Sequence, residues 1–344
     1  MNLDNMNISK RMEHYNVAGL SMARIDDGQI STTGEYGVLE LGLNNIVNRN
    51  SIFNACSISK FVTAILVMSL TEQGVLDLDQ DVNNRLISWK VPDYPFMTKS
   101  KVTLRTLLSH QSGITDPNNS FTELTSIHGI PTITDLLEGK TPYCTESIKV
   151  TYEPESDFQY SDAGFCVIQQ LIEDVMGRSF TDVMNERVFT PLDIKNSIFG
   201  QEELGREKGN LACGHNKQGL VVKGKYPIYP YPAASGLWST PTDIACLVIE
   251  LMDALNGKGR LGLSPESARE IITSQGSMVW TGLGLFLERS KQELEISSLG
   301  WGVGFQCLMV AYPFKGSGMV IMTNTDLGVH QLKGIIGEIY HSMA

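Results

Sequence analysis

A long apolar segment that begins just after a serine and a lysine places the strongest constraint on how this chain folds. Ser57 and Lys60 stand three residues apart, and residues 61–70 (FVTAILVMSL) follow them with apolar side chains on nearly every side. A helix that is apolar all round lies inside a protein, and Gly74 supplies a natural C-terminal stop. The segment therefore predicts a buried helix with a hydroxyl and an amine at its start.

The spacing of Ser57 and Lys60 indicates nucleophilic chemistry. Residues three apart on a helix face each other, and a serine becomes a nucleophile when a nearby lysine, kept neutral by burial, removes its proton. The N–H groups and dipole of a helix N-terminus can also stabilise an oxyanion. The alternative is a solvated Ser and Lys on an ordinary helix, because a chain of this length holds roughly one or two Ser-x-x-Lys sequences by chance. Here the motif occurs once, and it opens the most apolar helical stretch in the chain.

Composition indicates an ordinary globular protein and excludes several classes of partner. The 344 residues are enough for one large or two modest domains, and 42% hydrophobic and 19% charged residues are typical of a globular chain. A net charge of −11 argues against nucleic acid and anionic membrane as partners. No apolar run reaches the roughly 18–20 residues that span a bilayer. Residues 1–7 lack a basic region followed by an apolar core, so we expect no signal peptide and a cytoplasmic location.

The positions of cysteine and histidine favour neither disulfides nor a metal site. The six cysteines are scattered without Cys-x-x-Cys spacing, which favours reduced thiols over disulfide bonds. The six histidines are equally dispersed and form no His-Glu-x-x-His motif, so we expect no bound metal.

Strand patterns occur near both ends of the chain, and helical patterns occupy its middle. The first strand turns at Asp26-Asp27-Gly28, which is a strong hairpin signal. The strand patterns cover residues 19–25, 29–36, 282–288, 306–312 and 318–323. The clearest helical patterns cover residues 102–108, 163–175 and about 331–342.

This distribution predicts an α+β fold of two domains. We expect an antiparallel sheet with flanking helices from residues 1–60 and 245–344, and a mainly helical inserted domain from residues 61–244. The active site is then expected between the two domains.

A second candidate cluster is Tyr160-Ser161-Asp162, which leads into the helix predicted from Ala163. A phenol beside a lysine can relay a proton between a nucleophile and a leaving group. The alternative is structural, with Tyr160 as an amphipathic residue at a helix start and Asp162 as the helix N-cap.

A third cluster, residues 298–305 (SLGWGVGF), lies just before a predicted strand. Its glycines allow the backbone to approach a ligand closely, and their N–H groups can act as oxyanion donors. A bulged turn around Trp301 is the alternative. The chain contains no Gly-x-Ser-x-Gly, which argues against the nucleophile elbow of the α/β-hydrolases.

The order of these three clusters resembles that of the serine β-lactamase and penicillin-binding protein superfamily. It is most similar to the branch that holds class C β-lactamases, D-aminopeptidases and related esterases. The resemblance covers most of the chain, and further similar stretches are residues 17–23, 107–114, 233–241 and 312–324. The fold that it implies is a two-domain serine β-lactamase-like fold, with an antiparallel sheet flanked by helices and an inserted helical domain.

The resemblance also implies a role for each site residue. Ser57 is then the nucleophile that carries the acyl group, Lys60 is its base partner, and Tyr160 relays the proton. The N–H groups of Ser57 and Trp301 form the oxyanion hole. Water or another acceptor releases the acyl group, and no cofactor is needed.

Two positions depart from the pattern of that family. Asp162 stands where Asn is usual, and a carboxylate cannot donate a hydrogen bond unless it is protonated. Ser298, followed by Leu299 and Gly300, stands where Lys or His is usual, which weakens capture of a substrate carboxylate. These four residues are expected to contact the substrate.

We therefore expect a serine esterase or amidase that acts on small neutral substrates. The first alternative is D-alanyl peptidase or β-lactamase activity on peptides or β-lactams. The second is a catalytically weak binding protein that keeps the fold. The sequence makes no prediction of the physiological substrate, the acyl acceptor or the oligomeric state.

Overall fold

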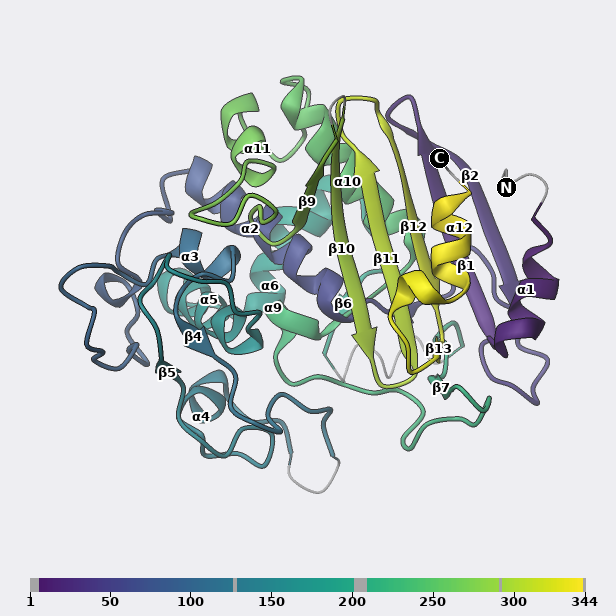
Figure 1. Cartoon of the computed structure of the whole chain (residues 1–344), viewed down its shortest axis with the longest axis horizontal. Coiled ribbons are helices and arrows are strands. Elements are labelled where there is room, and N and C mark those ends of the chain that lie inside the picture. Colours follow the sequence, from purple (N-terminus) through teal and green to yellow (C-terminus); the bar gives the residue numbers. More distant parts are fainter. Residues whose placement is uncertain (1–5, 126–128, 201–208, 291–292, 343–344) are drawn as a thin grey trace.

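A six-stranded antiparallel sheet organises the computed structural model, which describes residues 6–125, 129–200, 209–290 and 293–342. The strands run in the order β2-β1-β12-β11-β10-β9, so the first hairpin of the chain lies beside its last strands (Figure 1). These strands are β1 (Gly19–Asp26), β2 (Gln29–Gly37), β9 (Phe286–Arg289), β10 (Leu294–Gly302), β11 (Phe305–Tyr312) and β12 (Ser317–Thr323).

Both faces of the sheet are apolar, because successive residues of its central strands point into two different cores. In β11, Leu308 packs with α1 (Ile8–Tyr15) and α12 (Ile335–His341), while Cys307 belongs to the larger core on the opposite face. Helix α10 (Pro241–Leu255) packs on the sheet from that opposite side. Figure 1 shows α12 in front of the sheet and α10 behind it. The sheet is therefore a middle layer between helices.

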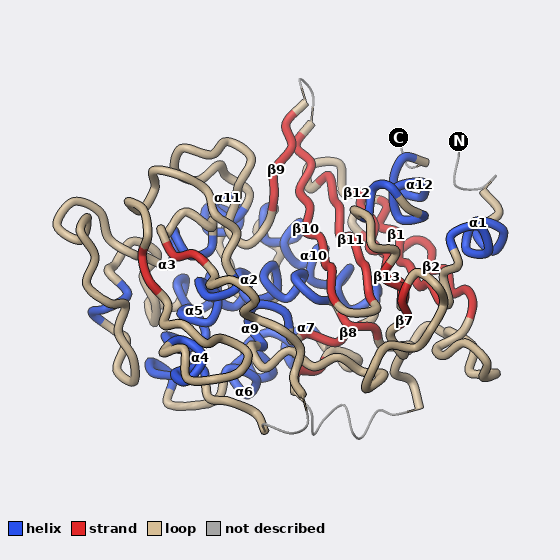
Figure 2. Tube along the Cα trace, turned by 60° about the horizontal axis from the view of Figure 1, so that its bottom comes forward, coloured by secondary structure: helices blue, strands red, loops and turns tan. Residues whose placement is uncertain are grey.

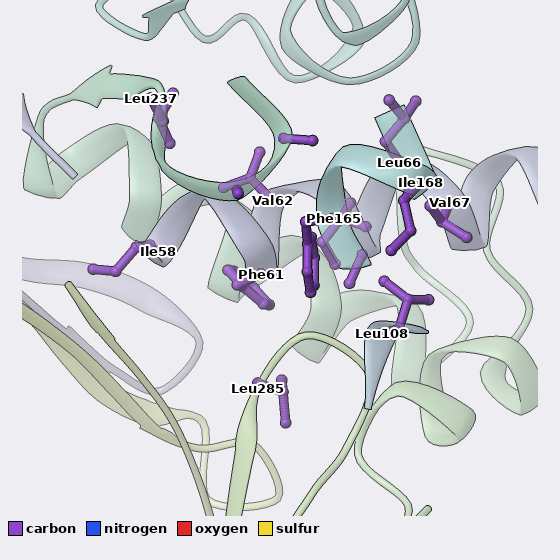
Figure 3. Packing of buried hydrophobic residues seen from close by; sticks show 14 of the residues in the cluster. Ile58, Phe61, Val62, Leu66, Val67, Leu108, Phe165, Ile168, Leu237 and Leu285 are labelled. Atoms are coloured by element: carbon purple, nitrogen blue, oxygen red, sulfur yellow. The ribbon is translucent and has the colours of Figure 1, made fainter. Parts of the chain in front are cut away.

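The helix predicted after the Ser-x-x-Lys motif is α2 (Ser59–Glu72), which is buried from its first residue to Leu70. Its side chains fill the middle of the larger core. There Phe61 lies beside Phe165 of α5 (Asp162–Met176), as Figure 3 shows. The prediction of a buried helix is confirmed.

Shorter elements complete the molecule. Figure 2 shows α3, α4, α5 and α6 grouped on one side of α2, with the large sheet on the other side. The short helices are α3 (Leu104–Leu108), α4 (Ile133–Leu137), α6 (Phe180–Met184), α7 (Thr190–Leu192), α9 (Pro232–Ser235) and α11 (Pro265–Ile271). The short strands are β3 (Phe53–Asn54), β4 (Ile114–Thr115), β5 (Lys149–Val150), β6 (Ile198–Phe199), β7 (His215–Asn216), β8 (Leu237–Ser239) and β13 (Thr325–Asp326).

The antiparallel sheet and its flanking helices are as predicted, but the strand predictions fail at two places. β9 begins at Phe286, later than the predicted start at residue 282, because the chain turns at Gly284 in left-handed backbone (φ 72°). Residues 298–302, expected just before a strand, form the second half of β10. Glycine is depleted in strands, so Gly300 and Gly302 conceal the strand pattern there.

The closing helix predicted over residues 331–342 is interrupted at Gly334. A 3₁₀ turn (Gln331–Lys333) precedes the glycine, whose extended backbone separates the turn from α12. The division of the chain into domains at residues 60 and 244 stays a prediction. Of the helices in the described part of the chain, none combines the length and the apolarity that a membrane crossing requires.

A truncation at Leu66 tests the burial of α2. Leu66 is fully buried, and removing such a side chain costs about 2–5 kcal/mol through lost apolar burial and the cavity left behind. We expect Leu66→Ala to lower the free energy of unfolding, measured by urea titration, by that amount. Ile87→Ala, at an isoleucine that is 74% exposed, is the control and should change it by less than about 0.5 kcal/mol. Equal effects of the two substitutions would contradict the buried position.

Candidate active site

Ser57 lies in a short 3₁₀ turn, Cys56–Ile58, that leads directly into α2. Cys56 has left-handed backbone (φ 48°), which a non-glycine residue keeps only when its surroundings hold it there. Asn54 provides that support. Its side-chain oxygen accepts the Cys56 N–H at 2.8 Å, and its amide group donates to the Pro227 carbonyl at 3.0 Å. The turn thereby fixes Ser57 at the N-terminal end of the buried helix.

The Lys60 ammonium has an acceptor for each of its three N–H groups. Nζ lies 3.2 Å from Ser57 Oγ, 2.5 Å from Asp162 Oδ1 and 2.9 Å from the Ala234 carbonyl oxygen. Burial, the largest single effect, lowers the pKa of Lys60, but the charge and hydrogen bond of Asp162 together with the interactions of Tyr160 outweigh it, so that the pKa stands above its ordinary value. Lys60 is therefore charged, and the expectation of a lysine kept neutral by burial is wrong.

Asp162 is the first residue of α5, and Ser161 is its N-cap. The Ser161 hydroxyl accepts the Gly164 N–H at 3.0 Å. The alternative that Asp162 caps the helix is therefore wrong, and its carboxylate pairs with Lys60 between α2 and α5. Because the two partners are 102 positions apart in the chain, no local sequence pattern indicates this contact.

A second carboxylate, Asp116, holds the start of α5 in place. Its oxygens accept the N–H groups of Asp162 and Ala163, both at 2.9 Å, and the Ser161 hydroxyl at 2.8 Å. Burial raises the pKa of Asp116, and the nearby charge of Asp162 raises it further. Asp116 thus fixes the position of Asp162, a role that no sequence pattern indicates.

Tyr160 contacts both Lys60 and His110. Lys60 Nζ lies 4.7 Å from the centre of the Tyr160 ring, and the His110 ring stacks on that ring with centroids 4.3 Å apart. Burial raises the pKa of Tyr160, although interactions with Lys60 and Ser57 oppose the rise. Burial and the Lys60 charge lower the pKa of His110, whose Nδ1 accepts the Ser161 N–H at 3.1 Å. The structure brings Tyr160 together with Ser57 and Lys60, and its catalytic role stays a prediction.

Gly300 lets β10 approach the turn that carries Ser57. A Cβ on Gly300 would overlap the Ala55 carbonyl oxygen and Cys307 Sγ, so only glycine fits at this position. The close approach holds the next residue of the strand, Trp301, near the same turn. The assignment of the Ser57 and Trp301 N–H groups to an oxyanion hole stays a prediction.

An open pocket of about 850 Å³ leads to Ser57. Of the residues expected to form the site, those that line it are Ser57, Tyr160, Asp162, Leu299 and Trp301. The carboxylates that line it are Glu123, Asp162 and Asp326. The lining also includes His330, but no lysine or arginine lines the pocket in the described part of the chain. The pocket therefore presents mainly negative charge to a ligand.

Ser298 does not line this open pocket. It is 4% exposed and lines a separate cavity of about 10 Å³ together with Ser57, Lys60 and Tyr160. A space of this size holds about one water molecule. Leu299 lines both the open pocket and the small cavity, and Gly300 packs against the Ser57 turn. A third cavity, of about 430 Å³ beside α4 and α5, is lined by none of the predicted site residues.

The fold and the side chains around Ser57 define the class of protein. A serine and a lysine one turn apart at the start of a buried helix, beside an antiparallel sheet, are features of β-lactamase-like serine hydrolases. The model of the family described as Beta-lactamase matches residues 5–334. The chain therefore belongs to the Beta-lactamase family, and the resemblance seen in the sequence is confirmed.

Two curated relatives share part of the chain. Penicillin-binding protein 4 of Amycolatopsis lactamdurans is 32% identical over 193 residues, which are 56% of this chain and 47% of that protein. The teichoic acid D-alanine hydrolase of Staphylococcus aureus (strain MRSA252) is 24% identical over 233 residues, which are 67% of this chain and 53% of that protein. The chain thus spans about half the length of these relatives.

A solved structure matches nearly the whole chain. The D-amino acid amidase of Ochrobactrum anthropi SV3, in complex with D-phenylalanine, superposes with a TM-score of 0.76. The match covers 99% of this chain and 98% of the amidase at 20% identity. At this identity the likeness shows a shared fold, which confirms the predicted fold class.

Substitution of Ser57 tests the nucleophile. Fluorophosphonates react with activated serines, so we expect labelling of the wild-type protein at Ser57. Ser57→Ala should lose both this label and p-nitrophenyl ester hydrolysis. Ser59→Ala is the control and should keep the label, because the Ser59 hydroxyl is buried and donates to the Cys56 carbonyl at 2.6 Å. A label that persists in Ser57→Ala would show that another residue is the nucleophile.

Lys60 and Tyr160 are expected to act as one proton relay. Lys60→Ala and Tyr160→Phe should each lower kcat for ester hydrolysis by about 10²–10⁴, the usual range for a positioned acid–base group. The double variant should lose little more than the worse single variant, because members of one catalytic unit are non-additive. Thermal unfolding serves as the control, since Lys60→Ala leaves the Asp162 carboxylate unpaired. Fully additive losses would indicate that Tyr160 is structural.

Proposed function

We propose that this chain is a serine esterase or amidase that forms an acyl-enzyme on Ser57 and acts on small substrates without a carboxylate. The charge of the open pocket carries this proposal. Its ionic lining side chains are carboxylates, and the nearby Lys60 is neutralised by Asp162. Two like charges 4 Å apart repel by about 1–4 kcal/mol at effective dielectric constants of 80 to 20. A penicillin or a peptide C-terminus that came this close to a lining carboxylate would meet this repulsion, and no lysine or arginine among the described lining residues would compensate for it.

In the proposed reaction, the Lys60–Tyr160 relay first loses one proton to solvent. Ser57 Oγ then attacks the acyl carbonyl carbon, and the serine proton passes to the relay. The Ser57 and Trp301 N–H groups stabilise the negative charge that develops on the carbonyl oxygen. The relay then protonates the leaving alcohol or amine, and the acyl group stays on Ser57. Water attacks the ester so formed, and the same groups return the proton to Ser57 Oγ.

An acyl group that carries an amine is the second candidate substrate. Glu123 and Asp326 line the same open pocket as Ser57, and each can accept charge-assisted hydrogen bonds from an ammonium group. Two similar proteins are named for related substrates, a teichoic acid D-alanine hydrolase and a D-amino acid amidase. Such acyl groups would be attracted by the same charges that repel carboxylates.

Three p-nitroanilides that differ only in the charge and structure of the acyl group distinguish a neutral, an amine-bearing and a carboxylate-bearing substrate. We expect kcat/KM to be higher for acetyl and D-alanyl p-nitroanilides than for the succinyl compound, whose free carboxylate is repelled. A charge-assisted hydrogen bond contributes about 1.5–3 kcal/mol, so the D-alanyl preference over acetyl is expected to be about 10–150-fold. Glu123→Gln and Asp326→Asn, compared one at a time, should reduce that preference if the carboxylate binds the amine. Equal kcat/KM for all three compounds would contradict selection by charge.

Benzylpenicillin tests the remaining alternatives. The proposal predicts slow acylation of Ser57 by benzylpenicillin, measured by mass spectrometry. Rapid acylation would support D-alanyl peptidase or β-lactamase activity instead. Labelling of Ser57 by a fluorophosphonate without turnover of any ester or amide would support a binding protein that keeps the fold.

A further inference from the structure

We propose that Asp162 sets the pH range in which Ser57 is reactive, by holding Lys60 as an ammonium ion. The inference rests on the proposed function in one respect, that Ser57 is the nucleophile. It assigns to Asp162 a positioning and electrostatic role instead of the substrate contact expected from the sequence. The enzyme would then work best at alkaline pH.

The first argument is the geometry around Lys60 Nζ. All three N–H groups donate, to Asp162 Oδ1, to the Ala234 carbonyl and to Ser57 Oγ. Nitrogen in this state has no lone pair with which to remove the Ser57 proton. Ser57 Oγ therefore accepts a hydrogen bond from Lys60, which is the reverse of the direction that catalysis by a lysine base requires. One proton must leave the cluster before Lys60 can act as the base.

The second argument is the strength of the pair that keeps this proton in place. The side chains of Lys60 and Asp162 are 3% and 20% exposed, so water screens their attraction weakly. An asparagine at position 162 could accept the same hydrogen bond without carrying a charge. Burial would then act on Lys60 with little opposition, and the neutral amine would form at lower pH.

The third argument concerns the other titratable groups around Lys60. Around Lys60 and its partner Asp162 they come from α5, from the segment that precedes it, and from the segments that follow α3 and β4. They are Tyr160, Cys166, His110 and Asp116. Burial raises the pKa of Tyr160 and of the Cys166 thiol, so both stay protonated and uncharged at neutral pH. His110 uses its Nδ1 to accept the Ser161 N–H, and Asp116 is bound by the start of α5. Asp162 therefore makes the largest contribution to the protonated state of Lys60, and Tyr160 adds to it.

The pH dependence of inactivation by phenylmethylsulfonyl fluoride tests the proposal. In this reaction an Oγ–S bond forms on Ser57, the S–F bond breaks, fluoride leaves, and the serine proton passes to the base. The rate reports the activation of Ser57 and does not depend on deacylation or on the natural substrate. It is measured from about pH 5 to pH 11 for the wild-type protein and for Asp162→Asn, and the wild-type rate should still be rising at the upper end of this range.

We expect the acid limb of Asp162→Asn to lie at lower pH than that of the wild-type protein. An opposite charge within about 4–6 Å favours the charged form of a group by a factor of about 10 to 1,000. Its removal raises the fraction of neutral Lys60 by that factor, so the rate at neutral pH should rise by about 10- to 1,000-fold. A base with a lower pKa is also less effective once it is deprotonated, so the plateau of the variant at high pH should not exceed that of the wild-type protein. The difference between the two rates should therefore narrow as the pH rises.

Two further variants complete the test, one as a control and one as a second removal of the Asp162 charge. Asp157→Asn removes an equal charge from the same segment, but at an exposed position where the carboxylate accepts only its neighbour's N–H in the described structure. Its profile should coincide with that of the wild-type protein. Asp162→Ala also removes the charge and should move the acid limb in the same direction as Asp162→Asn. It keeps the test decisive if the asparagine variant does not fold.

Each remaining outcome overturns one specific claim. A lower rate at every pH in a folded Asp162→Asn or Asp162→Ala, with an unmoved acid limb, would overturn the role of Asp162. Inactivation of Ser57→Ala at the wild-type rate would overturn the proposed function instead, because the reagent would then be modifying another residue. The two failures are therefore distinguishable.

Discussion

The ion pair between Lys60 and Asp162 is the contact on which the arrangement of the site depends. It joins the start of α2 to the start of α5 inside the protein, where an unpaired charge would cost several kcal/mol. Ser57 precedes one of these helices and Tyr160 precedes the other, so the pair also fixes the distance between them. Asp116 extends the constraint, because it binds the first backbone N–H groups of α5.

The same ion pair leaves the open pocket without the positive charge that a site for substrate carboxylates would need. The charge of Lys60 is neutralised by Asp162 within the protein. Ser298 of β10, at the position where the family usually has Lys or His, is uncharged and provides no other cation. The charges that remain exposed to a ligand are those of carboxylates such as Glu123 and Asp326. Under the proposed function, Asp162 thus links the protonation of Lys60 to the charge of the acceptable substrate.

Sequence periodicity predicts the elements that depend on local pattern and fails where tertiary contacts decide. The hairpin at residues 26–28 is readable from its Asp-Gly turn, and strands β11 and β12 are readable because each is a short apolar run between turn residues. The second half of strand β10 is not readable, since Gly300 is required by the Ser57 turn and not by the strand itself. In the site, the proximity of Ser57 and Lys60 follows from helical spacing. Local spacing does not predict the charge of Lys60 or the stacking of His110 on Tyr160. Each depends on a residue far away in the chain, Asp162 for Lys60 and Tyr160 for His110.

The pairing of β1 with β12 has a consequence for synthesis of the protein. Leu20 pairs with Thr323, about 300 residues later, so the first hairpin leaves the ribosome long before its neighbouring strand exists. At about 5–20 residues per second, this interval lasts about 15–60 s. Contacts of such long range also slow folding. A chain terminated before β12 would therefore leave this hairpin without its partner strand, and an unfinished product would be prone to aggregate and not form a smaller stable protein.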